Sequence, residues 1–178
     1  MSFLRRIFGR TSKEVTLTMC GLDQAGKTTI VNYLIHGEFR ETVPTMGVNR
    51  ETIDFPNIQF NVFDLGGQID FRSLWGEINE KSDALIYVVD RTDYMRLDES
   101  KKIFHEIIDT QISSCIPVLI LLNKVDLQDG ISRVDFVKNF ELLDPDMDIN
   151  WAVFETSART GQGIVDSFNW FVNALKDV

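Results

Sequence analysis

Residues 21–28 read Gly-Leu-Asp-Gln-Ala-Gly-Lys-Thr, the G-x-x-x-x-G-K-[ST] pattern of a phosphate-binding loop. The glycines let backbone N–H groups point inward at an anion, and a helix that begins here would add the positive end of its dipole. Lys27 would reach the outer phosphates, and the Thr28 hydroxyl would coordinate Mg2+. The alternative is a glycine-containing turn that matches by chance. An apolar alternating run before the loop and a helical pattern after it favour phosphate binding.

A second group of polar residues, Asp64-Leu65-Gly66-Gly67-Gln68, comes at the end of an apolar strand pattern. Asp64 is placed to hold Mg2+ directly or through water. Gly67 has no side chain, so its N–H can approach a terminal phosphate closely. Gln68 can orient an attacking water because its amide both donates and accepts hydrogen bonds. This pattern is weakly specific alone, but downstream of a phosphate-binding loop it indicates nucleotide hydrolysis.

Residues 123–126, Asn-Lys-Val-Asp, follow a continuous apolar run. An ionised Asp126 accepts two hydrogen bonds from guanine, and adenine offers no matching pair of donors. Asn123 can tie this segment to the phosphate-binding loop, and the stem of Lys124 can cover one face of the base. The backbone N–H of Ala158, in the Thr156-Ser157-Ala158 segment, could donate to guanine O6. An isolated match would be read as a solvated turn, but this context predicts guanine specificity.

The elements that must position these residues follow an alternating pattern of strands and helices. The expected strands cover residues 15–19, 48–55, 58–63, 83–90, 116–122 and 152–155, and the expected helices cover 27–36, 97–113, a segment opening at 132 and a segment from 164. Such alternation predicts an α/β sheet, mostly parallel, with helices on both faces and one antiparallel hairpin at 48–63. Ligands bind outside the carboxyl ends of parallel strands, and the polar groups above lie there.

Length and charge exclude several classes of protein. The 178 residues fit one domain, and no run approaches the roughly 18 apolar residues of a membrane-spanning helix. Residues 1–13 carry four cations and no acid, so within a net charge of −9 the remaining residues carry −13. An acidic body argues against a nucleic-acid partner. Two cysteines are too few for a disulfide framework, and the N-terminus lacks a signal peptide's apolar stretch, so we expect a cytoplasmic protein.

The first residues form a pattern of their own. At about 100° per residue, Phe3, Leu4, Ile7 and Phe8 fall in one arc, with arginines on the rest of the wheel. This predicts a short amphipathic basic helix and linker over residues 1–13, ahead of one domain over 14–178. Two turns of helix are marginal in water, so the segment needs a surface. That surface is a groove on the protein itself, a membrane interface, or each in turn.

Together these residues resemble a small GTPase of the Ras superfamily, and specifically its Arf, Arf-like and Sar branch. The resemblance covers essentially the whole chain and rests on residues 21–29, 44–49, 64–68 and 71–75. It implies a P-loop small G domain with a six-stranded, mostly parallel sheet, one antiparallel hairpin strand, about five flanking helices and the short N-terminal helix. It also implies a GTP/GDP switch that hydrolyses GTP with Mg2+ and acts in intracellular membrane traffic.

The resemblance implies a role for each residue of the site. Gln68, Lys27 and Thr45 would be catalytic, and Thr28, Thr45 and Asp64 would hold Mg2+. The residues expected to contact the nucleotide are Asp23, Gln24, Ala25, Gly26, Lys27, Thr28, Thr29, Thr45, Gly67, Asn123, Lys124, Asp126, Ser157 and Ala158. In the GTP state Thr45 would coordinate Mg2+ and Gly67 would meet the γ-phosphate, and both loops would relax after hydrolysis.

The resemblance also implies partners: an exchange factor, an activating protein that supplies an arginine, and effectors. The hairpin is expected to slide between states and expel the N-terminal helix, so that a monomeric, cytoplasmic protein meets membranes reversibly in its GTP state. Ser2 stands where a myristoylated member has glycine, so attachment would rest on Phe3, Leu4, Ile7 and Phe8.

Partner identity does not carry over. The positions of the aromatic trio that such proteins present to effectors hold Val48, Phe63 and Ile78, and only one of these is aromatic. Two other functions stay open: a nucleotide-gated interaction module with negligible turnover, and a P-loop ATPase or kinase, which Asp126 disfavours.

Overall fold

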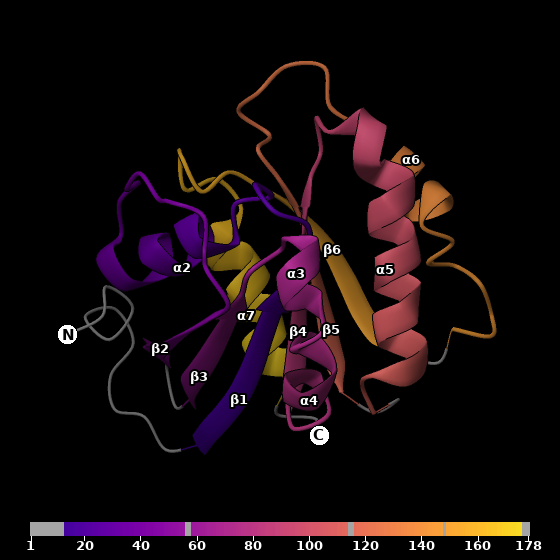
Figure 1. Ribbon diagram of the computed structural model, residues 1–178. Coiled ribbons are helices and arrows are strands. Elements are labelled where there is room, and N and C mark those ends of the chain that lie inside the picture. The colour runs from indigo at the N-terminus through magenta and orange to yellow at the C-terminus, as the bar shows by residue number, and fades with distance from the viewer. Residues whose placement is uncertain (1–12, 56–57, 114–115, 148, 176–178) are drawn as a thin grey trace.

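The computed structural model describes residues 13–55, 58–113, 116–147 and 149–175, in which strands and helices alternate (Figure 1). The strands are β1 (Lys13–Cys20), β2 (Val48–Phe55), β3 (Ile58–Leu65), β4 (Ala84–Asp90), β5 (Pro117–Asn123) and β6 (Asn150–Thr156). The helices are α2 (Lys27–His36), α3 (Ile69–Arg72), α4 (Trp75–Asn79), α5 (Leu97–Thr110), α6 (Arg133–Asn139) and α7 (Ile164–Ala174), and a 3-10 helix, η1, covers Tyr94–Arg96.

The strands form one six-stranded sheet in the order β2-β3-β1-β4-β5-β6. The pairings β1–β3, β1–β4, β4–β5 and β5–β6 are parallel, whereas β2–β3 is antiparallel. The prediction of a mostly parallel sheet with a single antiparallel hairpin strand is therefore confirmed. Parallel pairing brings the carboxyl ends of β1, β3, β4, β5 and β6 to one edge of the sheet.

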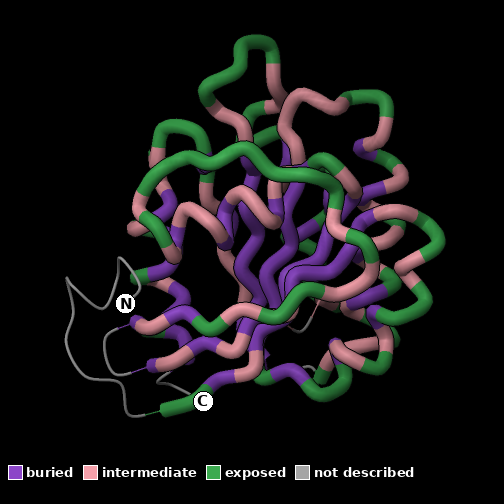
Figure 2. Tube along the Cα trace, turned by 60° about the vertical axis from the view of Figure 1, so that its left-hand side comes forward, coloured by how far each residue is buried: buried purple, intermediate pink, exposed green. Residues whose placement is uncertain are grey.

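The sheet is buried on both faces because its central strands β4 and β5 are apolar except at their last residues, Asp90 and Asn123. Along β4, Ile86 and Val88 point into one apolar cluster, and Leu85, Tyr87 and Val89 point into the other. This alternation follows from the two-residue period of a strand. In β5 all seven residues are buried, as expected for a strand between two layers of helices. The tube view shows the strands as a buried centre beneath exposed connections (Figure 2).

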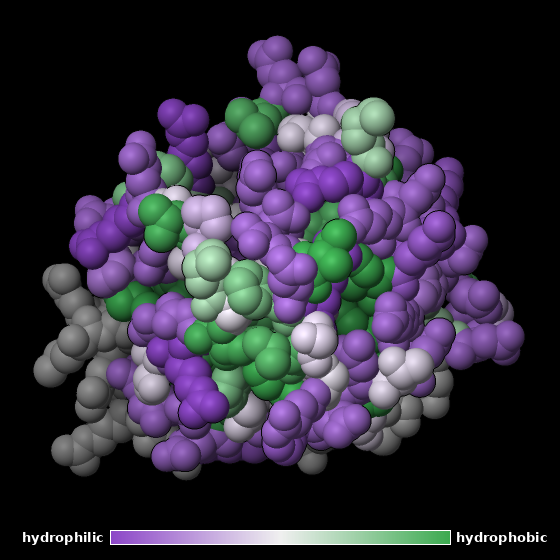
Figure 3. Space-filling view, in the orientation of Figure 1, coloured by the Kyte–Doolittle hydropathy of each residue, from purple (hydrophilic) through white to green (hydrophobic). Residues whose placement is uncertain are grey.

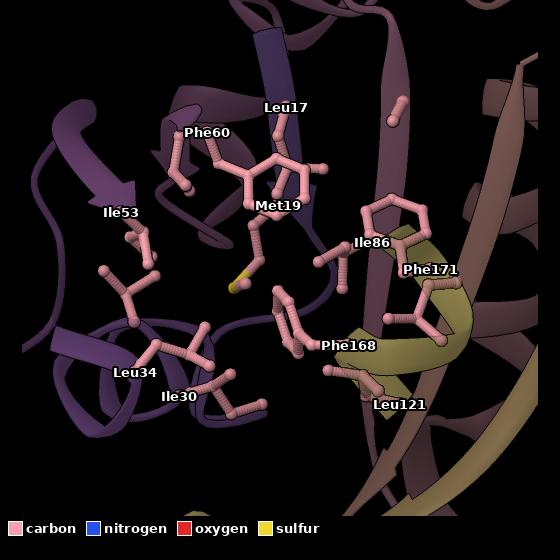
Figure 4. Close-up of a cluster of buried hydrophobic side chains, with 14 of the residues drawn as sticks. Leu17, Met19, Ile30, Leu34, Ile53, Phe60, Ile86, Leu121, Phe168 and Phe171 are labelled. Atoms are coloured by element: carbon pink, nitrogen blue, oxygen red, sulfur yellow. The ribbon is translucent and has the colours of Figure 1, made fainter. Parts of the chain in front are cut away.

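Helices α2 and α7 cover one face of the sheet, and α5 and α6 cover the other (Figure 1). Beneath the first pair, α7 inserts Phe168 and Phe171 toward the strands, and α2 contributes Ile30 and Leu34 (Figure 4). The ring centroids of Phe60 and Phe171 lie 6.0 Å apart in a stacked arrangement. This packing fixes where α2 begins, and α2 begins at the last residues of the phosphate-binding loop.

The ends of several elements differ from the sequence expectation. Strand β3 continues past Phe63 to Leu65, because β2 pairs with it as far as Val48 opposite Leu65. Helix α5 ends at Thr110 rather than 113, where β-branched and hydroxyl-bearing residues are weaker helix formers. The short helices α3 and α4 were not anticipated. Helix α6 opens where expected, and Ser132 caps it, since its hydroxyl accepts the N–H of Asp135 at 3.1 Å.

The predicted amphipathic segment and its apolar residues Phe3, Leu4, Ile7 and Phe8 lie outside the described residues, as do the turn at 56–57 and Cys115. Cys20, the last residue of β1, is buried. Among the residues that the structure describes, no helix is long and apolar enough to cross a bilayer.

Candidate functional site

A pocket of about 370 Å³ opens at the carboxyl edge of the sheet. Its walls come from the loop after β1, the start of α2, the loop before β2, the loop after β3 and the loop after β5. The lining residues are Asp23, Gln24, Gly26, Lys27, Thr28, Thr29, Thr42, Val43, Pro44, Thr45, Gly67, Gln68 and Lys124. Segments far apart in the sequence thus meet at one site, and most of the residues expected to bind nucleotide line it.

The phosphate-binding loop places its backbone tightly against its neighbours. Gly26 caps α2 in the left-handed region, with φ of 98°. A Cβ atom at Gly26 would lie 2.4 Å from the Nδ2 atom of Asn123, so a side chain fits neither the backbone conformation nor the space. The Nδ2 atom of Asn123 donates to the Ala25 carbonyl at 2.9 Å. The last residue of β5 therefore holds the loop that follows β1.

Lys27 is a buried cation at the base of this pocket. Its side chain is 5% exposed, and its Nζ atom donates to the carbonyls of Gly21 at 3.0 Å and Leu22 at 2.8 Å. Burial lowers the pKa of Lys27 to about 8, while the nearby carboxylate of Asp64 opposes that shift. The ammonium group thus has carbonyl partners that a phosphate oxygen can replace, and an anionic ligand would favour its charged form.

Three oxygen-bearing side chains converge beside Lys27. The Thr28 hydroxyl donates to the Oδ2 atom of Asp64 at 2.6 Å and lies 2.8 Å from the Thr45 hydroxyl. The Thr45 hydroxyl in turn donates to the same Oδ2 atom at 3.4 Å. The carboxylate of Asp64 is buried, and burial raises its pKa, with the Thr28 hydrogen bond acting in the other direction.

The second carboxylate oxygen of Asp64, Oδ1, is buried without a hydrogen-bond partner among the described residues. A buried charged oxygen in that state is costly unless something else binds it. Two hydroxyls and a carboxylate are the hard oxygen donors that Mg2+ prefers, and they lie beside the phosphate-binding loop. The donor set therefore fits a magnesium ion that a nucleotide would bring.

The loop after β3 is held against the phosphate-binding loop. A Cβ atom on Gly67 would lie 2.1 Å from the backbone nitrogen of Asp23, so only glycine allows this approach. The indole Nε1 atom of Trp75 donates to the Gly66 carbonyl at 3.1 Å, and the Nε atom of Arg72 donates to the Gly67 carbonyl at 3.1 Å. Gln68 follows directly and lines the pocket.

The loops after β5 and β6 build the other end of the site. The Ser157 hydroxyl donates to the Oδ1 atom of the exposed Asp126 at 2.6 Å, which orients that carboxylate. The Oδ1 atom of Asn123 accepts the N–H of Ala158 at 3.3 Å. This N–H was expected to meet guanine O6, but here it bonds within the protein. Asn123 therefore links the base loop to the phosphate loop on one side and to β6 on the other.

Lys124 adopts a left-handed backbone conformation, with φ of 69°. Its Nζ atom pairs with the Oδ2 atom of Asp90, at the end of β4, at 2.6 Å. The ion pair fixes the direction of the lysine stem, which lines the pocket next to the phosphate-binding loop. A base lying in this part of the pocket would rest against the aliphatic stem.

No site role was predicted for Asp90, Arg72 or Trp75, which hold site residues in place through an ion pair and hydrogen bonds. Arg72 and Trp75 lie in the segment 71–75 that supports the family resemblance, and Asp90 is the last residue of β4. The predicted residues that lie outside the pocket lining are Ala25, Asp64, Asn123, Asp126, Ser157 and Ala158. Asp64 is hydrogen-bonded to the lining residues Thr28 and Thr45, whereas the bonds described above for the other five join them to one another. The other predicted residues line the pocket.

Comparison with known proteins matches the chain to one family. The family model described as "ADP-ribosylation factor family" matches residues 1–175. ADP-ribosylation factor 1 of Brassica rapa subsp. pekinensis and ADP-ribosylation factor 3 of Arabidopsis thaliana are each 39% identical to the chain over 170 residues, covering 96% of this chain and 92% of the relative. The solved structure of the Arl6 BBS3 small GTPase from Trypanosoma brucei, with the bound nucleotide analogue GppNp, superposes with a TM-score of 0.80. The two sequences are 30% identical, and the match covers 92% of this chain and 98% of the chain in the solved structure.

Proposed function

We propose, from the premise that this chain belongs to the ADP-ribosylation factor family, that its carboxyl-edge pocket is where GTP binds and where its hydrolysis is controlled. The chain is a small GTPase, a GTP-binding molecular switch with a P-loop fold. As in the family at large, guanine nucleotide, regulators and effectors act on it. The role of each side chain and of Mg2+ is part of the proposal.

One observation carries the proposal: Thr45 contacts Thr28 and Asp64. The loop that precedes β2 thereby reaches the foot of α2 and the end of β3, with hydroxyl oxygens 2.8 Å apart. In the proposal, these three side chains would hold a nucleotide-bound Mg2+, which would neutralise the charge that develops during phosphoryl transfer. Loss of the γ-phosphate would weaken the interactions that hold Thr45 in the site. The loop that precedes β2 is therefore the part of the switch that moves.

The protein's own contribution to hydrolysis is positioning and electrostatics. The Lys27 ammonium exchanges its two loop carbonyls for phosphate oxygens. The N–H groups at the start of α2 and the N–H of Gly67 point at the same phosphates. Gln68 aligns the attacking water. None of the described residues that line the pocket is an arginine, so we expect slow hydrolysis until an activating protein supplies one.

The base end selects guanine in this proposal. Asp126, oriented by Ser157, accepts hydrogen bonds from the guanine N1–H and exocyclic amine. Lys124 covers one face of the base. The Ala158 N–H lies next to Asn123 and moves from that partner to guanine O6 when the base is bound.

A competition experiment tests the proposal. Purified protein loaded with a fluorescent GDP analogue is titrated with GTP and with ATP in Mg2+. We expect GTP to displace the probe and ATP to fail at the same concentration. Asp126→Asn should weaken GTP binding by about 10- to 100-fold, the value of one or two hydrogen bonds to a charged group. The matched control is Asp129→Asn, an exposed carboxylate in the same loop. Equal displacement by ATP would refute the base assignment.

Effectors are proposed to read the two loops that contact the phosphates. Val43 and Met46 precede β2 and are 82% and 75% exposed, while Ile69 and Leu74 lie in and after α3 and are 74% and 44% exposed. Figure 3 shows apolar side chains gathered at the centre of the face on which α3 and α4 lie. A surface that moves with the nucleotide and is apolar suits partners that distinguish GTP from GDP.

The N-terminal segment is proposed as a reversible membrane contact for a protein that is otherwise a cytoplasmic monomer. Its four apolar residues, Phe3, Leu4, Ile7 and Phe8, have arginines beside them, the composition of an interfacial helix. Such a contact joins the GTP state to membranes and so to intracellular traffic. The proposed division is an arm over 1–13 and a GTPase domain over 14–178.

A further inference from the structure

Asp23 puts a negative charge into a pocket built for phosphate. The residue lines that pocket in the middle of the phosphate-binding loop, and its carboxylate is close enough to Lys27 to favour the charged lysine. Left alone, this carboxylate would compete for Lys27 and repel an incoming anion. The loop therefore contains a group that works against its own ligand.

Arg96 holds that carboxylate from outside the loop. Its Nη1 atom contacts the Oδ1 atom of Asp23 at 2.8 Å, and its Nη2 atom donates to the Asp23 backbone carbonyl at 3.3 Å. The arginine is itself oriented by Asp93, whose Oδ2 atom lies 2.7 Å from Nε and 2.6 Å from Nη2. One guanidinium group thus fixes both the side chain and the backbone of Asp23, using the planar fork that only arginine offers.

The contact lies at the end of the pocket where a third phosphate would be. Gly67, proposed to meet the γ-phosphate, packs directly on the Leu22–Asp23 backbone, where a Cβ atom would lie 2.3 Å from the Leu22 carbonyl carbon. The proposed base-reading residue Asp126 follows β5, which β1 and β4 separate from β3 in the sheet. A free Asp23 carboxylate would therefore face a triphosphate more closely than a diphosphate.

We infer that Arg96 is a positioning residue that sets the preference of the site for GTP over GDP, by holding the Asp23 carboxylate away from the γ-phosphate. The inference rests on the proposed function, because it takes the pocket as the GTP site. Arg96 need not touch the nucleotide. It acts through Asp23, and Asp93 acts through Arg96.

The test compares affinities for fluorescent mant-GDP and mant-GppNHp in Mg2+ for the wild type, Arg96→Gln, Asp23→Asn and the double variant. Arg96→Gln should lower mant-GppNHp affinity by about 3- to 10-fold relative to mant-GDP, a modest factor because both side chains are about a third exposed and solvent screens them. Asp23→Asn removes the repelling charge, so adding Arg96→Gln to it should change the ratio of mant-GppNHp affinity to mant-GDP affinity by less than twofold. Arg133→Gln, an exposed arginine of α6, controls for the change in net charge.

Each outcome decides the inference. Equal losses for both nucleotides in Arg96→Gln would mean that Arg96 only stabilises the fold, and an equal fall in the ratio with and without Asp23→Asn would mean that it does not act through Asp23. Either result overturns the inference. Arg96→Lys, which keeps the charge but loses the fork, should give an intermediate ratio and serves if the glutamine variant does not fold. Failure of the wild type to bind either nucleotide would instead refute the proposed function.

Discussion

The carboxylate of Asp64 joins three parts of the molecule. Asp64 is the next-to-last residue of β3, and its carboxylate accepts hydrogen bonds from the Thr28 hydroxyl of α2 and from the Thr45 hydroxyl of the loop before β2. Because its Oδ1 atom has no partner among the described residues, the arrangement stores an unfavourable burial that a bound cation relieves. We therefore assign the metal dependence of nucleotide binding to these side chains.

Thr28→Ala should weaken that dependence. In Mg2+ the variant should release a fluorescent GDP analogue about tenfold faster than the wild type, because one oxygen of the metal site is gone and Asp64 loses its shortest hydrogen bond. In excess EDTA the two proteins should release it at similar rates. The Thr29 hydroxyl meets Thr42 at 3.2 Å rather than Asp64, so Thr29→Ala should change the release rate by the same factor in Mg2+ and in EDTA. A tenfold difference that persists in EDTA would contradict the metal assignment.

At the scale of elements, the segment from Gly66 to α4 is held in place by side chains that do not line the pocket. Trp75, 1% exposed, donates its indole N–H to the Gly66 carbonyl. Arg72 donates to the Gly67 carbonyl and also forms an ion pair with Glu99 of α5, in which Nη2 lies 2.8 Å from Oε1. These bonds fix the backbone that presents Gln68 without occupying the pocket. The helices α3 and α4 thus serve as a support for the reacting end of the site.

Trp75→Phe should separate positioning from binding. The phenyl ring keeps most of the packing but leaves a buried carbonyl without its donor, which should lower the free energy of unfolding by about 1–2 kcal/mol. Hydrolysis of bound GTP should slow several-fold, while GDP affinity should stay within twofold. Trp170→Phe, on the other face of the sheet beside Phe171, is the control. If GDP affinity fell as far as the hydrolysis rate did, the support role would be wrong.

Much of the arrangement of strands and helices could be predicted from the sequence. Local signals in the sequence are the apolar runs that form β4 and β5 and the polar residues at their ends. Parallel pairing of the strands then brings those ends to one edge of the sheet. The Arg96–Asp23 contact was not predictable, because it joins positions 73 residues apart through a 3-10 helix with no sequence signature. Likewise, only the folded chain shows that the Ala158 N–H has Asn123 as its partner. Motifs identify groups that touch ligand, whereas the groups that hold them depend on tertiary packing.

At the scale of the whole molecule, the sheet separates two apolar cores and gathers every functional loop at one edge. The acidic body and the basic first residues form a second asymmetry. An anionic bilayer would repel the body and attract the arm, so the arm is the part that decides membrane binding. The proposal thus gives the chain a nucleotide site at one edge of the sheet and a membrane contact at its N-terminus.

Flotation with anionic liposomes tests that coupling on the full chain. Protein loaded with GppNHp should float with the vesicles, and GDP-loaded protein should remain below. Leu4→Gln with Phe8→Gln should abolish flotation in the GppNHp state, because burial of these side chains supplies the binding energy. Leu143→Gln, a side chain 72% exposed on the body, should have no effect. Equal flotation in both nucleotide states would refute the coupling.

The central claim is that the pocket hydrolyses GTP with Gln68 aligning the water. Single-turnover release of phosphate from bound GTP tests this most directly, with Mg2+, in the presence and absence of a cell extract that contains activating proteins. We predict intrinsic release on the order of 10⁻⁴ s⁻¹, strong acceleration by the extract, and loss of that acceleration in Gln68→Leu but not in Gln128→Leu, an exposed glutamine after β5. Unchanged acceleration in Gln68→Leu, or no phosphate release under any condition from protein that holds GTP, would contradict the account.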